Sequence, residues 1–275
     1  MMNFIKGGLL LASALFFSCG NAQDNANNRP VVLIKTDFGE MKVALYNETP
    51  RHRDNFLKLA KEGYFDGQLF HRVIRNFMIQ GGDPDTKTAQ PGQKLGNGGP
   101  GYEIENEINP NLLHKKGALA AARQGDATNP QKKSSGSQFY IVQGLVLPAS
   151  NLQSIEEEGN VKLAQKIMNQ MAMAKSDSLK FYQQTNNKNG FDKLVAKLQV
   201  AATDSAKQTP YKLTETQKQL YSTVGGTPHL DGNYTVFGEV IEGLAVLDSI
   251  AAQPTGPQDR PVKDIRMEVK VIKEK

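Results

Sequence analysis

The chain has 275 residues, of which 39% are hydrophobic and 22% are charged, the composition of a soluble globular protein. Lys and Arg exceed Asp and Glu by only 33 − 28 = 5, and the basic residues form no continuous block, which argues against nucleic-acid binding. The length allows one large domain or two small ones.

The N-terminal segment has the pattern of a secretion signal. Lys6 precedes an apolar run at residues 7–17 that is too short to span a bilayer. Cys19, the single cysteine, follows this run and resembles the lipidated cysteine of bacterial lipoproteins. We therefore predict a signal peptide at 1–18, lipidation of Cys19, a flexible tether at 19–29 and attachment to the periplasmic side of a bacterial cell envelope. An ordinary secretory signal and an incidental buried cysteine are the alternatives.

Short strands and one helix are predicted in the first half of the chain. Residues 31–46 have the pattern of two strands around a turn. A helix is expected over 50–61, with Thr49 as its N-cap and Pro50 at the first helical position. Residues 84–100 are rich in turn formers and predict a long loop. Further predicted strands cover 73–80, 138–142, 235–240 and 265–272, and a short helix covers 244–251.

Residues 145–226 have a different, helical pattern, for which we expect about three helices. Apolar residues recur at helical spacing, once around Ile167 and once around Leu194, and Thr214 to Gln217 has the form of a capping box. The methionine-rich stripe favours a core role over a surface that holds unfolded proteins.

Four blocks of sequence, taken in order, resemble the cyclophilin family of prolyl isomerases. Residues 70–83 read FHRVIRNFMIQGGD, which strongly resembles the family signature. The other blocks are GGPGY at 98–102, SGSQFYI at 135–141 and LDGNYTVFG at 230–238. Residues 117–123 are similar to the corresponding segment of bacterial members.

The resemblance implies a mainly β fold, a closed eight-stranded antiparallel barrel capped by two helices. Residues 30–144 would form the first part of the barrel and residues 227–275 the second. The helical stretch 145–226 would then be an insertion at one loop.

The implied activity is cis/trans isomerisation of X–Pro bonds in proline-containing polypeptides. The amide barrier is about 18–20 kcal/mol, and no covalent bond has to break, so we expect neither a cofactor nor a metal. The resemblance implies Arg72 as the main donor to the substrate carbonyl and Gln80 as the residue that orients it. The implied substrate-binding residues are Phe77, Met78, Ala122, Arg123, Gln138, Tyr140, His229, Leu230 and Tyr234.

Several interpretations stay open at this stage. Taken alone, Arg72 would be a solvated surface cation, and Phe77, Met78 and Leu230 would be plain core. The whole chain could serve as a client-binding folding helper through its helical stretch, or as a scaffold with a dead site. We expect a monomer that binds a lipid membrane through Cys19 and binds no nucleic acid. His229 stands where many eukaryotic members have Trp, so tight cyclosporin binding is not implied.

Overall fold

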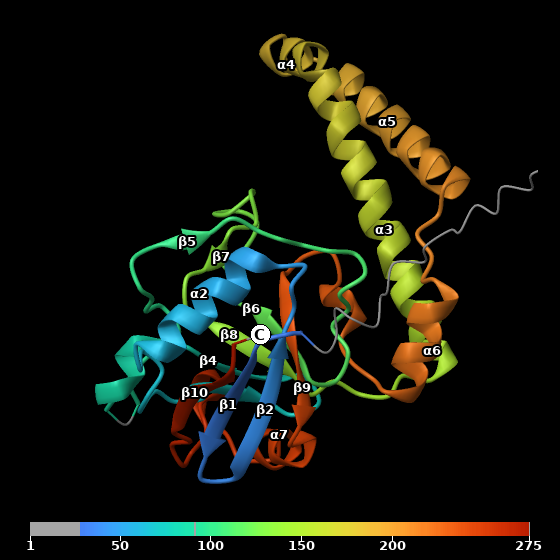
Figure 1. Cartoon of the computed structure of the whole chain (residues 1–275). Helices are drawn as coiled ribbons and strands as arrows, with labels where there is room; N and C mark the ends of the chain where they lie inside the picture. The colour runs from blue at the N-terminus through green and yellow to red at the C-terminus, as the bar shows by residue number, and fades with distance from the viewer. Residues whose placement is uncertain (1–27, 91, 275) are drawn as a thin grey trace, which may run out of the picture.

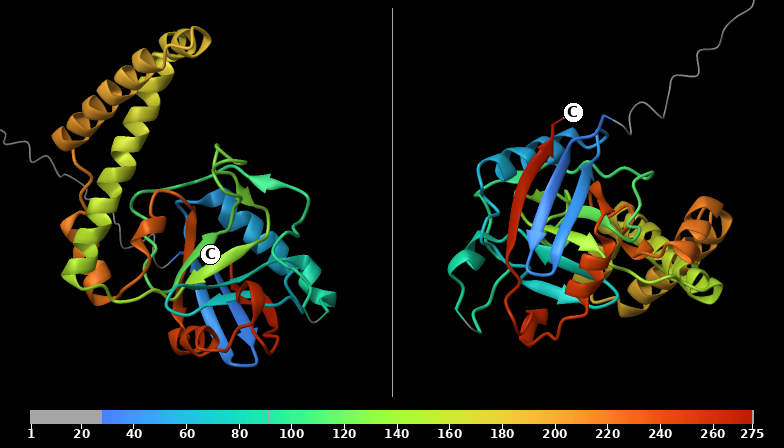
Figure 2. Two further views of the ribbon diagram at one scale, coloured as in Figure 1. Left: turned by 180° about the vertical axis from the view of Figure 1, so that it is seen from behind. Right: turned by 60° about the horizontal axis from the view of Figure 1, so that its bottom comes forward.

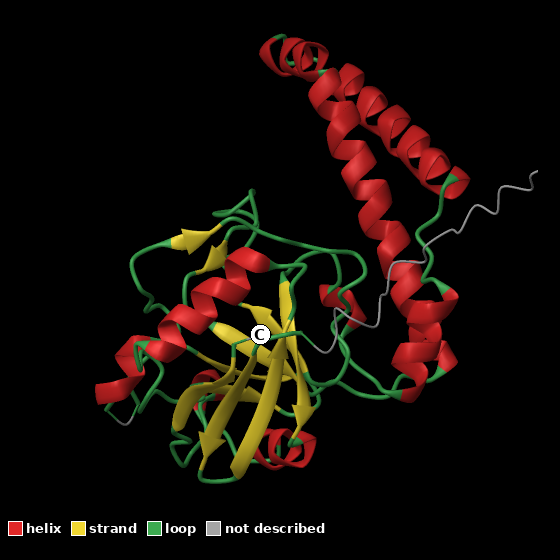
Figure 3. Cartoon of the chain, in the orientation of Figure 1, coloured by secondary structure: helices red, strands yellow, loops and turns green. Residues whose placement is uncertain are grey.

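The computed structural model describes residues 28–90 and 92–274. Its main body is a curled sheet of eight antiparallel strands with helices packed against it (Figures 1 and 3). The predicted signal peptide and Cys19 lie outside the described residues, as does most of the predicted tether. Within the described part of the chain, no helix is long and apolar enough to cross a membrane.

The first two strands form the predicted hairpin. Strand β1 (Val31–Thr36) pairs along its length with β2 (Gly39–Leu45). Val32 and Ile34 are buried while their neighbours are partly exposed, the alternation that period-two patterning predicts. Gly39 has φ = +122°, and a Cβ there would lie 2.9 Å from Val246, so the turn requires glycine.

Helix α2 (Pro50–Lys61) occupies the predicted residues and begins with Pro50. The prediction that the Thr49 side chain caps it is wrong, because the Thr49 hydroxyl is buried without a hydrogen-bond partner. The Glu107 carboxylate does this instead, accepting from the backbone nitrogens of Arg51 and His52 at 3.0 Å each. A carboxylate from a distant loop thus satisfies donors that the local sequence leaves open.

The predicted strand over 73–80 is two strands. β3 (Arg72–Ile74) turns back into β4 (Met78–Gly81), and the two pair antiparallel. Asn76 makes this turn with φ = 64°, a left-handed conformation that Asn tolerates better than most residues. The polar pair Arg75-Asn76 interrupts the apolar residues at this turn, and the prediction of a single strand ran through it.

The remaining strands complete the sheet in the order β10-β1-β2-β9-β6-β8-β4-β3. Their bounds are β6 Ala118–Ala121, β8 Phe139–Val142, β9 Val236–Glu242 and β10 Met267–Lys273, while β5 (Glu103–Ile104) and β7 (Ser134–Ser135) form a separate pair. Three short 3₁₀ helices are η1 (Pro84–Thr88), η2 (Pro228–Leu230) and η3 (Pro257–Asp259).

The prediction of a closed barrel needs correction. Among the described residues no ladder joins the end strands β3 and β10, so the sheet is a curled half-barrel. An isolated bridge between Leu69 and Arg266 brings the two edges together just before each strand begins.

The main core lies inside the curl, between the sheet and the helices α2 and α7 (Leu244–Ala251). Phe56 on α2 is at its centre, with ring centroids 4.8 Å from Phe65 and 5.3 Å from Phe139. These contacts join α2 to β8, the strand that carries part of the candidate site.

Four helices, rather than about three, lie between β8 and β9: α3 (Ala149–Ala174), α4 (Ser176–Gln184), α5 (Lys188–Gln208) and α6 (Glu215–Thr223). Helices α3 and α5 project from the sheet as a long antiparallel pair (Figures 1 and 2). The two predicted apolar stripes face each other there, with Met168, Leu198 and Ala202 buried between them. The capping box at Thr214 is present and opens α6.

Candidate active site

The β3–β4 hairpin places Arg72 and Gln80 side by side. They are direct partners in the ladder, and partners in neighbouring antiparallel strands project to the same face. The Nη1 of Arg72 lies 3.5 Å from the Oε1 of Gln80, at the long limit of a hydrogen bond. The Arg72 side chain is 42% exposed, so its guanidinium is accessible to a ligand.

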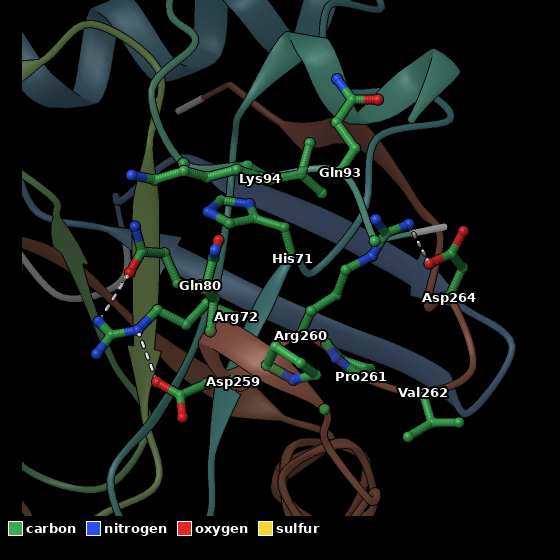
Figure 4. A pocket seen from close by; sticks show the side chains of 16 residues that line it. His71, Arg72, Gln80, Gln93, Lys94, Asp259, Arg260, Pro261, Val262 and Asp264 are labelled. Carbon is green, nitrogen blue, oxygen red and sulfur yellow. Dashed lines mark hydrogen bonds and ion pairs between the residues drawn. The ribbon is translucent and has the colours of Figure 1, made fainter. Parts of the chain in front are cut away.

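A second partner of Arg72 comes from near the C-terminal end of the chain. The Nε of Arg72 donates to the Oδ2 of Asp259 at 3.2 Å, and Figure 4 shows the guanidinium between Gln80 and Asp259. Asp259 has φ = 61°, uncommon for a residue other than glycine. Sequence analysis missed Asp259, because 187 positions separate it from Arg72 and no motif contains it.

Gln80 is held in turn by a second amide. Its Nε2 donates to the Oε1 of Gln138 at 3.0 Å, and the Nε2 of Gln138 donates to the carbonyl oxygens of Gly96 and Gly98 at 3.0 and 2.8 Å. This use of the Gln80 nitrogen leaves its oxygen facing Arg72. The connected amides therefore restrict the orientation of the guanidinium.

A cavity of about 180 Å³ lies beside Arg72. One part of its wall is formed by firmly packed side chains, since Met78 is 2% exposed and Tyr140 is 5% exposed. Phe77 and Leu230 are partly buried against the same cluster. An apolar recess next to a permanent cation suits a ligand with an apolar ring adjacent to a polar carbonyl.

Nine of the eleven predicted catalytic and substrate-binding residues line this cavity: Arg72, Phe77, Met78, Gln80, Ala122, Arg123, Tyr140, Leu230 and Tyr234. The other two lie next to it. Gln138 lines a neighbouring cavity of about 550 Å³. His229 stacks on the ring of Phe77, with centroids 5.6 Å apart and planes 24° apart.

Arg123 and Tyr234 support each other at one wall of the cavity. The Arg123 guanidinium carbon lies 4.6 Å from the Tyr234 ring centroid, within range of a cation–π contact. The Nε of Arg123 donates to the carbonyl oxygen of Asn233 at 2.8 Å, and its Nη1 pairs with Asp126 at 2.6 Å. Arg123 thus holds the aromatic wall in place.

His71 lies on the other side of Arg72, in a cavity of about 770 Å³ that Figure 4 shows. Its ring is buried, and neither ring nitrogen has a hydrogen-bond partner. Burial lowers the pKa of His71 to about 4, although the nearby Asp83 opposes the shift. The histidine beside Arg72 is therefore neutral at neutral pH and does not repel the guanidinium. Sequence analysis gave His71 no role in the site.

Over the described ranges, no three His, Cys, Asp or Glu residues come together in a way that could hold a metal ion. The candidate site thus consists of one accessible guanidinium, two linked amides and an apolar recess.

Residues 31–271 match the sequence model of a family described as cyclophilin type peptidyl-prolyl cis-trans isomerase/CLD. A Staphylococcus aureus protein provisionally named a peptidyl-prolyl cis-trans isomerase is 32% identical over 238 residues, which cover 86% of this chain and 88% of that protein. A Streptococcus pyogenes protein provisionally named a bifunctional phosphatase/peptidyl-prolyl cis-trans isomerase is 34% identical over 242 residues, 87% of this chain. The match spans only 38% of that longer protein.

Two crystal structures of a Cryptosporidium parvum cyclophilin type peptidyl-prolyl cis-trans isomerase have a similar fold. One has a TM-score of 0.52 at 20% identity and covers 90% of this chain and 99% of its own. The second, in the presence of the dipeptide Ala-Pro, has a TM-score of 0.50 at 20% identity and covers 88% of this chain.

Proposed function

The chain belongs to the cyclophilin-type peptidyl-prolyl cis-trans isomerase family, and we propose that it accelerates the isomerisation of X–Pro bonds in proteins that fold outside the cytoplasm. Uncatalysed, this reaction takes tens to hundreds of seconds, slow enough to limit folding. The single observation that carries the proposed chemistry is the position of Arg72 at the edge of the apolar cavity, held by Gln80 and Asp259.

The proposed mechanism uses the difference between a planar and a twisted amide. The substrate proline ring occupies the recess formed by Phe77, Met78 and Tyr140. As the C–N bond twists, resonance is lost and the lone pair localises on the proline nitrogen. Arg72 then donates to the carbonyl of the residue before proline and approaches that nitrogen, so it stabilises the twisted form more than either planar form.

The proposed location rests on the N-terminal sequence. The apolar run at residues 7–17 followed by Cys19 supports export and lipidation at that cysteine. Metabolic labelling with a radioactive fatty acid in a bacterial host tests this directly. The full chain should incorporate label and sediment with membranes, and Cys19→Ser should do neither. Equal labelling of the two would contradict the anchor.

The alternative of a client-holding module is not favoured, because the apolar stripes of α3 and α5 are packed against each other.

A coupled protease assay tests the activity, since the protease cleaves only the trans form of a short X–Pro peptide. Wild type should speed cleavage of the cis fraction, and Arg72→Ala should lose about 100-fold in kcat/KM, the usual cost of removing one preorganised donor. Arg75→Ala is the matched control, because Arg75 is exposed and lies outside the lining of the cavity. Equal losses in both variants would contradict the role of Arg72.

A further inference from the structure

A line of buried and half-buried hydrogen bonds joins helix α6 to the cavity beside Arg72. The hydroxyl of Tyr221 on α6 donates to the Oδ2 of Asp231 at 2.6 Å. The Oδ1 of the same carboxylate lies 2.9 Å from the Nδ1 of His114. The Nε2 of His114 lies 3.0 Å from the hydroxyl of Tyr140, which lines the cavity.

The chemistry of the carboxylate fixes the direction of the two hydrogen bonds to Asp231. A carboxylate only accepts, so Asp231 accepts one hydrogen bond from the Tyr221 hydroxyl and another from the Nδ1 of His114. The Nε2 of His114 pairs with the Tyr140 hydroxyl at 3.0 Å. Tyr140 therefore turns its hydroxyl away from the cavity toward His114 and presents its ring to the ligand.

Because these groups are shielded from water, each of them needs its hydrogen-bond partner. Tyr221 and His114 are fully buried, Tyr140 is 5% exposed, and the Asp231 side chain is 11% exposed. A hydroxyl in such a place costs free energy unless it is paired, so each group depends on the next. Burial also raises the pKa values of Tyr140 and Tyr221 far above their ordinary range, so both remain donors.

The base of the helical segment packs against the loop before β6 that carries His114. Tyr221 packs in one cluster with Leu152 and Leu213, and Leu113, the neighbour of His114, contacts that cluster. The backbone of His114 accepts from Thr227 at 2.8 Å, just after α6 ends. Asp231 directly follows Leu230, which lines the cavity. Tyr221 is thus linked to Leu230 through Asp231, and to Tyr140 through Asp231 and His114.

We propose that Tyr221 is a positioning residue for the prolyl pocket: through Asp231 and His114 it fixes the ring of Tyr140, and helix α6 is thereby part of the machinery that binds proline. This inference rests on the proposed function, because it assigns Tyr140 to the pocket that receives the substrate ring. Since Tyr140 contacts the proline ring in both planar and twisted forms, loosening it weakens binding more than the chemical step.

A double-mutant cycle on kcat/KM tests the proposal, with the full chain and the coupled protease assay. Tyr221→Phe removes one hydroxyl and no packing. It should raise KM and lower kcat/KM about fivefold, the factor carried by one hydrogen bond of ordinary net strength, with kcat nearly unchanged. In a Tyr140→Phe background the same substitution should change kcat/KM less than twofold. The hydrogen bond between His114 and the hydroxyl at position 140 is then already absent.

Tyr211→Phe is the matched control. Tyr211 packs against the same cluster as Tyr221, and within residues 28–90 and 92–274 no residue forms a hydrogen bond with its hydroxyl. It should leave KM unchanged. A fivefold effect of Tyr221→Phe that persists in the Tyr140→Phe background would overturn the proposal, and so would an unchanged KM in Tyr221→Phe. A wild type with no activity on any X–Pro peptide would instead contradict the proposed function.

If Tyr140→Phe does not fold, NMR of the chain with ring-labelled tyrosine decides the question. The proposal expects the Tyr140 ring resonance to shift or broaden in Tyr221→Phe and to stay in place in Tyr211→Phe. An unmoved Tyr140 resonance in Tyr221→Phe would overturn it.

Discussion

Arg72 and Asp259 form an ion pair that holds the candidate catalytic guanidinium from the side opposite Gln80. The pair joins the first strand of the β3–β4 hairpin to a 3₁₀ turn before β10. Both side chains are more than 40% exposed, so the pair contributes little to folding stability. Its effect is to limit the directions in which Arg72 can point.

Asp259→Asn should therefore lower kcat/KM for an X–Pro peptide about threefold, because a less restricted guanidinium spends less time in the productive orientation. The free energy of unfolding should change by less than about 0.5 kcal/mol. Asp264→Asn is the matched control, since Asp264 pairs with Arg260 at 2.9 Å and does not contact Arg72. An unchanged kcat/KM in Asp259→Asn would show that Gln80 alone orients Arg72.

Removal of the Glu107 carboxylate should destabilise the fold. Glu107→Ala leaves two backbone donors at the start of α2 and the Nδ1 of His52 without an acceptor. We expect a loss of about 1–3 kcal/mol in the free energy of unfolding, measured by urea denaturation. Glu105→Ala removes only an exposed pair with Lys133, and its effect should stay below about 0.5 kcal/mol. Equal effects in the two variants would refute the capping role of Glu107.

Stability should fall as the pH is lowered from about 6.5 to about 4. Burial holds the pKa of His71 at about 4 in the folded protein, whereas an unfolded chain has the ordinary value near 6.5. The unfolded state therefore binds a proton first, and the stabilisation present above pH 6.5 is lost as the pH falls through this window. This difference between the folded and unfolded pKa of His71 corresponds to a loss of about 3 kcal/mol in the free energy of unfolding.

Urea denaturation of wild type and His71→Gln at several pH values measures this effect. The variant should show a shallower fall between pH 6.5 and 4. His52, whose pKa burial also lowers, contributes to the remaining slope. Identical slopes in wild type and variant would contradict the assignment to His71.

Gly226 is required at the junction between the helical segment and the sheet. It has φ = +151°, and a Cβ there would lie 2.2 Å from the carbonyl oxygen of His114. Gly226→Ala should lower the free energy of unfolding by about 2–4 kcal/mol and raise KM, because it displaces His114. Gly232→Ala is the control: it has φ = +71° with no atom near the added Cβ, so its cost should be about 1 kcal/mol. Similar losses of unfolding free energy in Gly226→Ala and Gly232→Ala would show that close packing at Gly226 is unimportant.

Local patterns predicted the elements whose causes are local. The helix over 50–61 has Pro50 at its start and buried Phe56, Leu59 and Ala60 on one face, and it lies where the sequence places it. The reversal at Asn76 was missed, because the apolar residues on both sides of Arg75 and Asn76 together predict one strand.

Contacts between distant segments lay beyond the reach of these patterns. The resemblance named the residues that line the cavity, but not Asp259, His114 or Asp231, which hold them. His114 and Asp231 are 117 positions apart, and neither is unusual in its own neighbourhood. Only the curl of the sheet brings such residues together.

Two-dimensional exchange NMR on a short X–Pro peptide, with the chain lacking its first 21 residues, tests the central claim most directly. It observes the cis and trans forms interconverting without any coupling enzyme. We predict exchange cross-peaks at low protein concentration for wild type and for Arg75→Ala, and their loss in a folded Arg72→Ala variant. Absence of cross-peaks with the folded wild-type protein would contradict the account.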